Sequence, residues 1–383
     1  MSTQQLTFIE FFAGAGMARV GLGSRWRCIL ANDIDPTKAA AYRANFTPAR
    51  ELLVQDVAAL TPDVVGSRPD LVWASFPCQD LSLAGNGAGL SGGRSGTFWP
   101  FWELVNRLHE KNRGPRLVAL ENVYGTLTSR RGRDFRSIVD AISRTGYRVG
   151  ALVIDAVHFL PQSRPRLFIV GLHESSPLPR QLVLDGPESV WHSRAVVQAH
   201  EELPKSLQAS WVWWKVPPPN RPPPRLLDVI EDDPKSVAWH TPNQTAHILG
   251  LMSPLHRAKV ATATRMGRRL VGTVYRRTRS TADGVKRQRA EVRFDGVAGC
   301  LRTPRGGSSR QTILVVDGQS IRSRLLSPRE AARLMGLPDR YRLPENYNEA
   351  YHLAGDGVAV PVVRHLSRTL LVPLLGASPR SAA

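Results

Sequence analysis

The chain has 383 residues, 42% of them hydrophobic, so it can bury a sizeable core, and its length favours two domains over one. Lys and Arg number 51 against 32 Asp and Glu, and the net charge of +19 indicates a polyanion as the large partner, nucleic acid before an anionic membrane. No stretch of roughly 18 to 20 apolar residues, signal peptide or C-x-x-C pair is evident, so we expect a cytoplasmic protein with no membrane span, disulfide framework or metal site.

The first 172 residues alternate short apolar runs with amphipathic stretches, the pattern of a parallel sheet joined by crossover helices. Open α/β sheets bind ligands at the carboxyl ends of their strands, so the polar and glycine-rich residues after each strand are the first functional candidates. Strands are predicted for 6–12, 28–33, 70–76, 116–123, 147–156 and 166–172, with a further short strand before Asp56, and helices for 36–45, 98–111 and 133–145.

A glycine-rich turn follows the first predicted strand. Gly14 and Gly16 stand where a tight turn into a helix lets a ligand approach the backbone, and Asp33 ends the next strand, where a carboxylate can bind ribose hydroxyls. A purely structural turn is the alternative. The turn lacks the third glycine of a dinucleotide site, so S-adenosylmethionine fits better, with Phe12 to stack on adenine and Asp56 to accept from its amino group.

A single cysteine, Cys78, follows the predicted strand 70–76 and stands between Pro77 and Gln79. The proline stiffens the strand exit, and the glycines between residues 85 and 96 predict a loop that can move. A small fraction of an ordinary thiol is thiolate at neutral pH, and that fraction is strongly nucleophilic. A rigid nucleophile with a mobile cover is one interpretation, and a buried structural cysteine is the other.

Two later stretches favour the catalytic interpretation. Glu121 ends the strand in ALENV, where it would lie near Cys78 if both strands belong to one sheet. Arg164 and Arg166 in QSRPR are two residues apart, so they share a face of an extended chain. A nucleophile, an acid and an arginine pair are therefore expected at one edge of the sheet.

After about residue 175 the alternation stops, which suggests an inserted domain of irregular structure. Its tryptophans at 211, 213 and 214 are expected to form core, and the proline run at 216–225 to be a stiff connector. Between Arg257 and Arg293 there are twelve Lys or Arg against two acidic residues, which could contact phosphates or read guanine edges in the major groove; a solvated basic surface is the alternative.

Regular structure is predicted again from residue 300. The stretch 312–318 reads as a strand, and 360–375 is apolar enough for a closing helix. Ser327 and Glu330 have the spacing of a capping box at a helix start.

In combination, these motifs resemble the DNA (cytosine-5)-methyltransferases of the compact prokaryotic type. The match covers about two-thirds of the chain, from about 6 to 173 and from about 296 to 372, with the motifs in the family's order. The matching stretches are FFAGAG (11–16), ANDID (31–35), FPCQDLS (76–82), ENV (121–123), QSRPR (162–166), LSPREAARLMGLPD (326–339) and LAGDGVAVPVV (353–363).

The resemblance implies an α/β fold, namely a Rossmann-like S-adenosylmethionine-dependent methyltransferase sheet with helices on both faces, plus a smaller irregular target-recognition domain. The expected division is a catalytic and cofactor-binding domain at 1–182, completed by 348–383, and a target-recognition domain with its hinge at 183–347.

The resemblance also implies the reaction. Cys78 would add to C6 of cytosine so that C5 takes the methyl group of S-adenosylmethionine, giving S-adenosylhomocysteine; loss of the C5 proton and β-elimination then free the enzyme. Glu121 would hold or protonate N3 and bind the amino group, Arg166 would bind O2, and Arg164 would position Cys78 or Glu121. The carbonyl of Phe76 would bind the exocyclic amine.

A base inside a duplex is out of reach, so base flipping is implied too. The loop would close over the flipped base, with contacts from Gln79, Ser82, Arg94 and Thr97. The implied cofactor contacts are Phe12, Gly14, Gly16, Asp33, Ile34, Asp56, Asp356 and Val358. Asp356 stands where the family has Asn, Asp33 where Glu is commoner, and Ile34 where an aromatic residue is frequent.

The expected partner is double-stranded DNA, methylated by a monomer in the cytoplasm at the nucleoid, alone or beside a cognate restriction endonuclease. One alternative is a transfer RNA cytosine-5 methyltransferase. The other is a catalytically silent homologue that binds DNA, which the intact Cys78, Glu121 and Arg166 disfavour.

Overall fold

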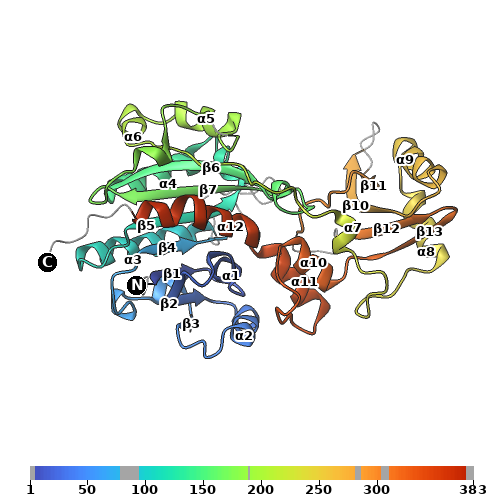
Figure 1. Ribbon diagram of the computed structural model, residues 1–383, viewed down its shortest axis with the longest axis horizontal. Coiled ribbons are helices and arrows are strands. Elements are labelled where there is room, and N and C mark those ends of the chain that lie inside the picture. Colours follow the sequence, from blue (N-terminus) through green and yellow to red (C-terminus); the bar gives the residue numbers. More distant parts are fainter. Residues whose placement is uncertain (1–4, 78–94, 189, 281–285, 303–309, 377–383) are drawn as a thin grey trace. The chain divides into compact units, whose positions relative to one another are not determined.

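The computed structural model describes residues 5–77, 95–188, 190–280, 286–302 and 310–376, and these form two compact units (Figure 1). The first unit comprises residues 1–155, 165–220 and 358–383. The second comprises residues 156–164 and 221–357.

A seven-stranded sheet is the frame of the first unit (Figure 1). Its order is β3-β2-β1-β4-β5-β7-β6, and its neighbours are parallel except that β7 runs antiparallel to both β5 and β6. The antiparallel strand departs from the predicted parallel sheet because residues 156–164, which join β6 to β7, are too few for a crossover helix. The strands are β1 Leu6–Phe11, β2 Trp26–Asp33, β3 Leu52–Val54, β4 Leu71–Ala74, β5 Leu117–Val123, β6 Tyr147–Asp155 and β7 Pro165–His173, which confirms the predicted strands.

Helices cover both faces of this sheet, as predicted. On one face, β1 places Ile9 and Phe11 in a core shared with α3 and α4, where Phe11 packs against Phe101 at 5.1 Å between ring centroids. On the other face, Trp26 donates its indole N–H to Ser367 Oγ at 2.9 Å and so ties β2 to the C-terminal helices. The larger helices are α1 Met17–Leu22, α2 Pro36–Asn45, α3 Phe98–Glu110, α4 Arg133–Arg144, α12 Val360–Leu366 and α13 Val372–Gly376, with a π-helix at Ser367–Leu371.

The expectation that no stretch reaches membrane-spanning length is wrong for the C-terminal helices. The helical run Tyr347–Gly376 contains a window of mean hydropathy 1.4, enough by length and composition alone to cross a membrane. Within that window 61% is buried inside the protein. Burial in the core therefore accounts for its apolar composition.

The tryptophan cluster belongs to the first unit, not to the inserted domain for which it was predicted as core. Trp214 is fully buried and donates its indole N–H to the carbonyl of Val170 on β7 at 3.1 Å. The N–H of Val212 donates to the carbonyl of Val149 on β6. These bonds hold the segment 183–220 on the sheet, so the first unit ends at 220 and not at the expected residue 182. That segment contains β8 Val183–Leu184, α5 Arg194–Glu201, α6 Lys205–Ala209 and β9 Trp213–Trp214.

The second unit is regular, which corrects the prediction of an irregular domain. Its four-stranded antiparallel sheet has the order β11-β10-β12-β13, and α8 and α9 pack on one face through Ile248, Val260 and Ala263. Its two longest strands, β10 and β11, hold many charged residues, so they lack the clear alternation of apolar and polar residues that predicts a strand. The elements are α7 Leu226–Val229, α8 Pro242–Gly250, α9 Pro254–Arg265, β10 Leu270–Ser280, β11 Lys286–Arg293, β12 Thr312–Asp317, β13 Ser320–Leu325, α10 Pro328–Leu334 and α11 Tyr347–Asp356.

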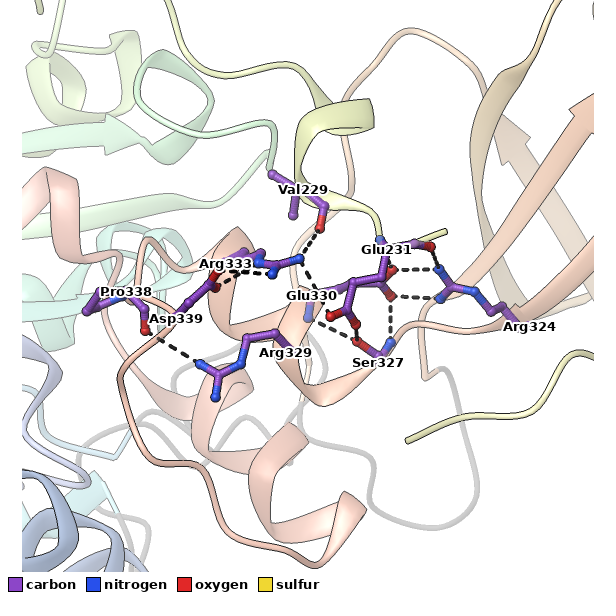
Figure 2. Close-up of polar contacts among 9 residues, drawn as sticks. All are labelled: Val229, Glu231, Arg324, Ser327, Arg329, Glu330, Arg333, Pro338 and Asp339. Atoms are coloured by element: carbon purple, nitrogen blue, oxygen red, sulfur yellow. Dashed lines mark hydrogen bonds and ion pairs between the residues drawn. The ribbon is translucent and has the colours of Figure 1, made fainter. Parts of the chain in front are cut away.

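A buried ion pair joins three segments of this unit (Figure 2). Arg324 on β13 and Glu330 on α10 are both fully buried and form two hydrogen bonds, of 2.8 and 2.6 Å. The backbone N–H groups of Ser327 and Glu231 donate to the same carboxylate, each at 2.7 Å, so it accepts four hydrogen bonds. The capping box predicted at Ser327 and Glu330 is confirmed. Glu330 also holds the segment that contains Glu231, because it accepts from the backbone N–H of that residue.

Candidate functional site

The carboxyl ends of β1 and β2 form the first half of the candidate site. The N–H of Gly14 donates to Asp33 Oδ2 at 2.7 Å, and the N–H of Asp35 donates to Asp33 Oδ1 at 2.9 Å. Gly14 has φ +55°, and a Cβ placed on it would meet nothing within 4 Å. The turn therefore leaves open space directly above its backbone, next to a carboxylate that is 8% exposed.

Gly16 has a different role from the one expected. A Cβ on Gly16 would lie 2.3 Å from the ring of Phe46 and 3.0 Å from Tyr42, and its φ is +78°. The missing side chain lets α1 pack against α2. The sequence predicted that both glycines make room for a ligand. In the structure only Gly14 faces open space, whereas Gly16 makes room for the rings of Phe46 and Tyr42.

The other predicted cofactor residues lie at or near the same strand ends. Ile34 follows β2 and is 64% exposed, an unusual exposure for isoleucine that suits contact with a planar apolar group. Phe12 follows β1 and packs edge-on against Phe101. Asp56 follows β3, is exposed, and uses Oδ1 to cap a short helix by accepting from the N–H of Ala58 at 2.9 Å.

These donors and acceptors fit an adenosine-containing group such as S-adenosylmethionine. Asp33 and Asp56 keep lone pairs for hydroxyl and amino donors, Ile34 offers an apolar surface, and the turn offers room above Gly14. Val358 is buried in the first unit, and Asp356 ends α11 in the second, so their predicted cofactor contacts stay predictions.

An acid and an arginine form the second half of the candidate site. Arg166 Nε lies 3.2 Å from Glu121 Oε1, and the side chains are 15% and 9% exposed. In the register of β5 and β7, Glu121 lies opposite Phe168 and Val123 opposite Arg166, so Glu121 and Arg166 are diagonal neighbours on one face. The expected proximity of Glu121 and Arg166 is confirmed. Glu121 lies on β5, the strand next to β4, and the chain that follows β4 leads to Cys78.

Asn122 is a residue that sequence reasoning did not single out within ENV. Its Nδ2 donates to the carbonyl of Phe76 at 3.2 Å, while its Oδ1 accepts from the N–H of Val123 and the hydroxyl of Thr126. Asn122 therefore ties the end of β5 to the chain two residues before Cys78. The carbonyl of Phe76, predicted to bind the exocyclic amine, already accepts one hydrogen bond and has one lone pair left.

Arg164 does not share the environment of Arg166, although it was expected on the same face. It is 2% exposed and donates to the carbonyls of Leu301 at 3.1 Å, Gly355 at 2.9 Å and Gly357 at 2.6 Å. Gly355 and Gly357 end α11, where exposed carbonyls and the helix dipole attract a cation. These contacts make Arg164 a helix-capping residue of the second unit, and its role beside Cys78 stays a prediction.

Part of the predicted machinery lies outside the described residues, namely Cys78, Gln79, Ser82 and Arg94. Thr97 is described and ends the short helix Ser95–Thr97 that leads into α3.

Glu10 is a second residue that sequence reasoning missed. It lies on β1, is 2% exposed, and its Oε2 has no hydrogen-bond partner among the residues that the structure describes. Burial raises its pKa to about 8, an effect that nearby Arg19 partly opposes. A carboxyl group this close to Asp33 is therefore largely protonated at neutral pH.

Comparison with known proteins gives a consistent result. A family profile described as C-5 cytosine-specific DNA methylase matches residues 6–371. Among curated proteins, the chain is 26% identical to the Type II methyltransferase M.HpaII of Haemophilus parainfluenzae, over 97% of this chain and 90% of that protein. It is also 26% identical to the Type II methyltransferase M.BsuFI of Bacillus subtilis, over 97% of this chain and 74% of that one.

Solved structures with the same fold include the Entamoeba histolytica methyltransferase EhMeth, with a TM-score of 0.64 and 14% identity over 97% of this chain and 99% of that one. The S. pombe Dnmt2 methyltransferase has a TM-score of 0.57 and 17% identity over 97% of this chain and 99% of that one. At these identities the likeness concerns the fold alone.

Proposed function

Because the chain belongs to the C-5 cytosine-specific DNA methylase family, we propose that it transfers a methyl group from S-adenosylmethionine to C5 of a flipped-out cytosine in a specific double-stranded DNA sequence. The observation that carries this proposal is the Glu121–Arg166 pair, held at 3.2 Å beside the strand that leads to Cys78. The relatives named Type II methyltransferases support DNA as the substrate.

Cys78 is the proposed nucleophile. Its thiolate adds to C6 of the cytosine ring, and the electron pair of the C5–C6 double bond moves toward C5 and N3. Glu121 holds N3 and the amino group through its carboxyl, which lowers the cost of charge on the ring. Arg166 keeps Glu121 in place and donates to O2 of the base.

S-adenosylmethionine supplies an electrophilic methyl group when bound. Asp33 would accept from its ribose, Ile34 and Phe12 would contact the adenine, and Asp56 would accept from the adenine amino group. Once C5 carries the methyl group, the C5 proton passes to water, the electron pair of the C5–H bond re-forms the C5–C6 double bond, and the C6–S bond breaks to return the thiolate. Asn122 keeps the segment before Cys78 in register with Glu121 throughout.

The second unit is the proposed target-recognition part, and the duplex is its ligand. We further propose that the enzyme acts as a monomer on cytoplasmic DNA at the nucleoid and works beside a restriction endonuclease of the same specificity. The names of the relatives support the last point, because Type II enzymes methylate the sites that such nucleases cut.

The direct test uses radiolabelled S-adenosylmethionine with unmethylated genomic DNA in one arm and bulk transfer RNA in the other. Label in DNA cytosine that vanishes in Cys78→Ala is the expected result. Label in transfer RNA alone would transfer the function to RNA. Binding of DNA without label in either arm, at saturating cofactor, would favour a silent homologue.

A further inference from the structure

The end of the β10–β11 hairpin continues beyond the sheet of the second unit as a two-stranded ribbon. β10 pairs with β12 only over Leu270–Val274, whereas it pairs with β11 as far as Ser280. On the outer edge of β11, a bridge joins Ala290 to Met252. Among the described residues, 277–280 and 286–289 therefore pair only with each other, and we call these eight residues the ribbon.

The ribbon carries five basic residues and no acidic one. In its register Arg277 lies opposite Arg289, and Arg279 opposite Arg287. Like charges directly opposite each other on one face of a strand pair destabilise it. Arg277 and Arg287 are exposed and Arg289 is half-buried, so this face presents a concentrated positive charge to its surroundings.

Two other arginines of the stretch 257–293 already have acidic partners. Arg269 lies 2.5 Å from Asp232, and Arg293 donates to Asp295 at 2.8 and 3.1 Å. In the ribbon, Arg277 has a loose contact of 3.5 Å with Glu291, and the described residues provide no ion pair for Arg287 or Arg289. Arg277, Arg287 and Arg289 therefore keep donors for a ligand, whereas Arg269 and Arg293 are neutralised within the protein.

The ribbon also has dimensions that suit a nucleic-acid groove. Four residue pairs of a strand pair extend roughly 10 Å, and two strands lie about 4.8 Å apart. The major groove of B-DNA is about 12 Å wide and about 8.5 Å deep, and it admits a two-stranded ribbon. Arg is the side chain whose forked donors match the O6 and N7 acceptors of guanine there.

We propose that the ribbon enters the major groove of the substrate duplex and that Arg277, Arg287 and Arg289 read guanine, so the recognition sequence contains guanine near the target cytosine. This inference rests on the proposed function for the existence of a DNA substrate. It goes beyond it by naming the reading side chains and the bases they read.

The test maps the methylated site of the wild-type enzyme and then replaces each of its guanines, one at a time, with 7-deazaguanine, which lacks the N7 acceptor. Loss of the N7 hydrogen bond of one arginine–guanine pair should lower kcat/KM by roughly 10-fold. In the Arg289→Ala variant, 7-deazaguanine at the position that Arg289 reads should cause no further loss of kcat/KM. Arg269→Gln, which removes one charge from a paired arginine, should stay within about twofold of the wild type.

Phosphate contact alone would overturn the proposal. In that case 7-deazaguanine would leave kcat/KM unchanged, and Arg277→Gln, Arg287→Gln and Arg289→Ala would weaken binding to every duplex alike, each lowering the salt slope by about 1. A methylated site without guanine would overturn it too. If the wild type methylates no DNA, the proposed function fails. The ribbon can still be tested separately: duplexes that bind the protein are selected by affinity, and their equilibrium binding is compared with that of the same duplexes containing 7-deazaguanine.

Discussion

The two units of this protein hold their charges in opposite ways. In the first unit, acidic groups are buried at and near the carboxyl ends of the strands: Glu10, Asp33 and Glu121 are 2%, 8% and 7% exposed. In the second, residues 221–357 hold 24 Lys or Arg against 13 Asp or Glu, and Arg277 and Arg287 of the ribbon are exposed. A buried carboxyl group can hold a proton or an ordered donor, whereas an exposed guanidinium attracts a polyanion. This contrast assigns the reaction to the first unit and binding of the substrate to the second in the proposed function.

That separation predicts that variants in the first unit change turnover or cofactor affinity, while variants in the second change stability or DNA recognition.

Glu121→Gln should lower kcat by about 100- to 10,000-fold, because the amide can neither protonate nor hold N3 as the acid does. Calorimetric affinity for S-adenosylhomocysteine should stay unchanged, since β5, which carries Glu121, is separated by β4 and β1 from β2, which carries Asp33 of the proposed cofactor site. Glu103→Gln, an exposed acid on α3 with a side chain 57% exposed, is the control and should retain full activity. Near-normal turnover in the Glu121 variant would remove this residue from the reaction.

Arg324→Met should destabilise the second unit by about 3–5 kcal/mol, because it leaves Glu330 buried without its cation. Hydrogen exchange resolved by peptides should show the loss in 221–357 and spare the first unit. The double variant with Glu330→Met should recover most of the stability, since no charge is then left unpaired. Equal loss in both units would mean that they unfold as one body.

Asp33→Ala should weaken S-adenosylhomocysteine binding about tenfold, because it removes a charged acceptor from the ribose and from the N–H of Gly14. Titration calorimetry without DNA measures this directly. Asp63→Asn, an exposed carboxylate with a side chain 72% exposed, serves as the control. An unchanged affinity in the Asp33 variant would argue that the cofactor lies elsewhere.

Glu10→Gln should flatten the dependence of stability on pH. The folded protein holds the Glu10 proton up to about pH 8, whereas an unfolded carboxyl group releases it near 4.5, so the wild type loses stability as pH rises through this range. The slope is at most about 1.4 kcal/mol per pH unit, and the variant lacks it. Urea unfolding at pH 6, 7 and 8 measures the difference, and parallel curves for the two proteins would contradict a buried neutral acid.

The sequence predicted the first unit in detail because its strands are apolar runs and its helices are amphipathic. Both signals are local, so residues 36–45 were predicted as the helix that is found there. The proximity of Glu121 and Arg166 was also predictable, since both stand at strand ends of one sheet. The direction of β7 was predictable too, although the parallel prediction missed it, because the nine residues between the predicted strands 147–156 and 166–172 are too few for a crossover helix.

Three features of the site required the three-dimensional structure. Gly16 packs against Phe46, which lies thirty residues later in the chain. The sequence alone could therefore not distinguish this packing role from that of a ligand-binding turn. Arg164 looked equivalent to Arg166, but its partners come from residues 301–357. The ribbon exists because β12 stops pairing with β10 at Val274, and this end of the pairing could not be predicted from the composition of the strands.

The central claim is that Cys78 forms a covalent bond to C6 of a DNA cytosine. Its most direct test replaces the target cytosine of the mapped duplex with 5-fluorocytosine, adds S-adenosylmethionine, and identifies the product by mass spectrometry. Fluorine cannot leave C5 as a proton does, so the account predicts a stable protein–DNA adduct on the peptide that contains Cys78 and none in Cys78→Ala. Steady methylation of ordinary DNA with no trapped adduct, or an adduct on another residue, would contradict it.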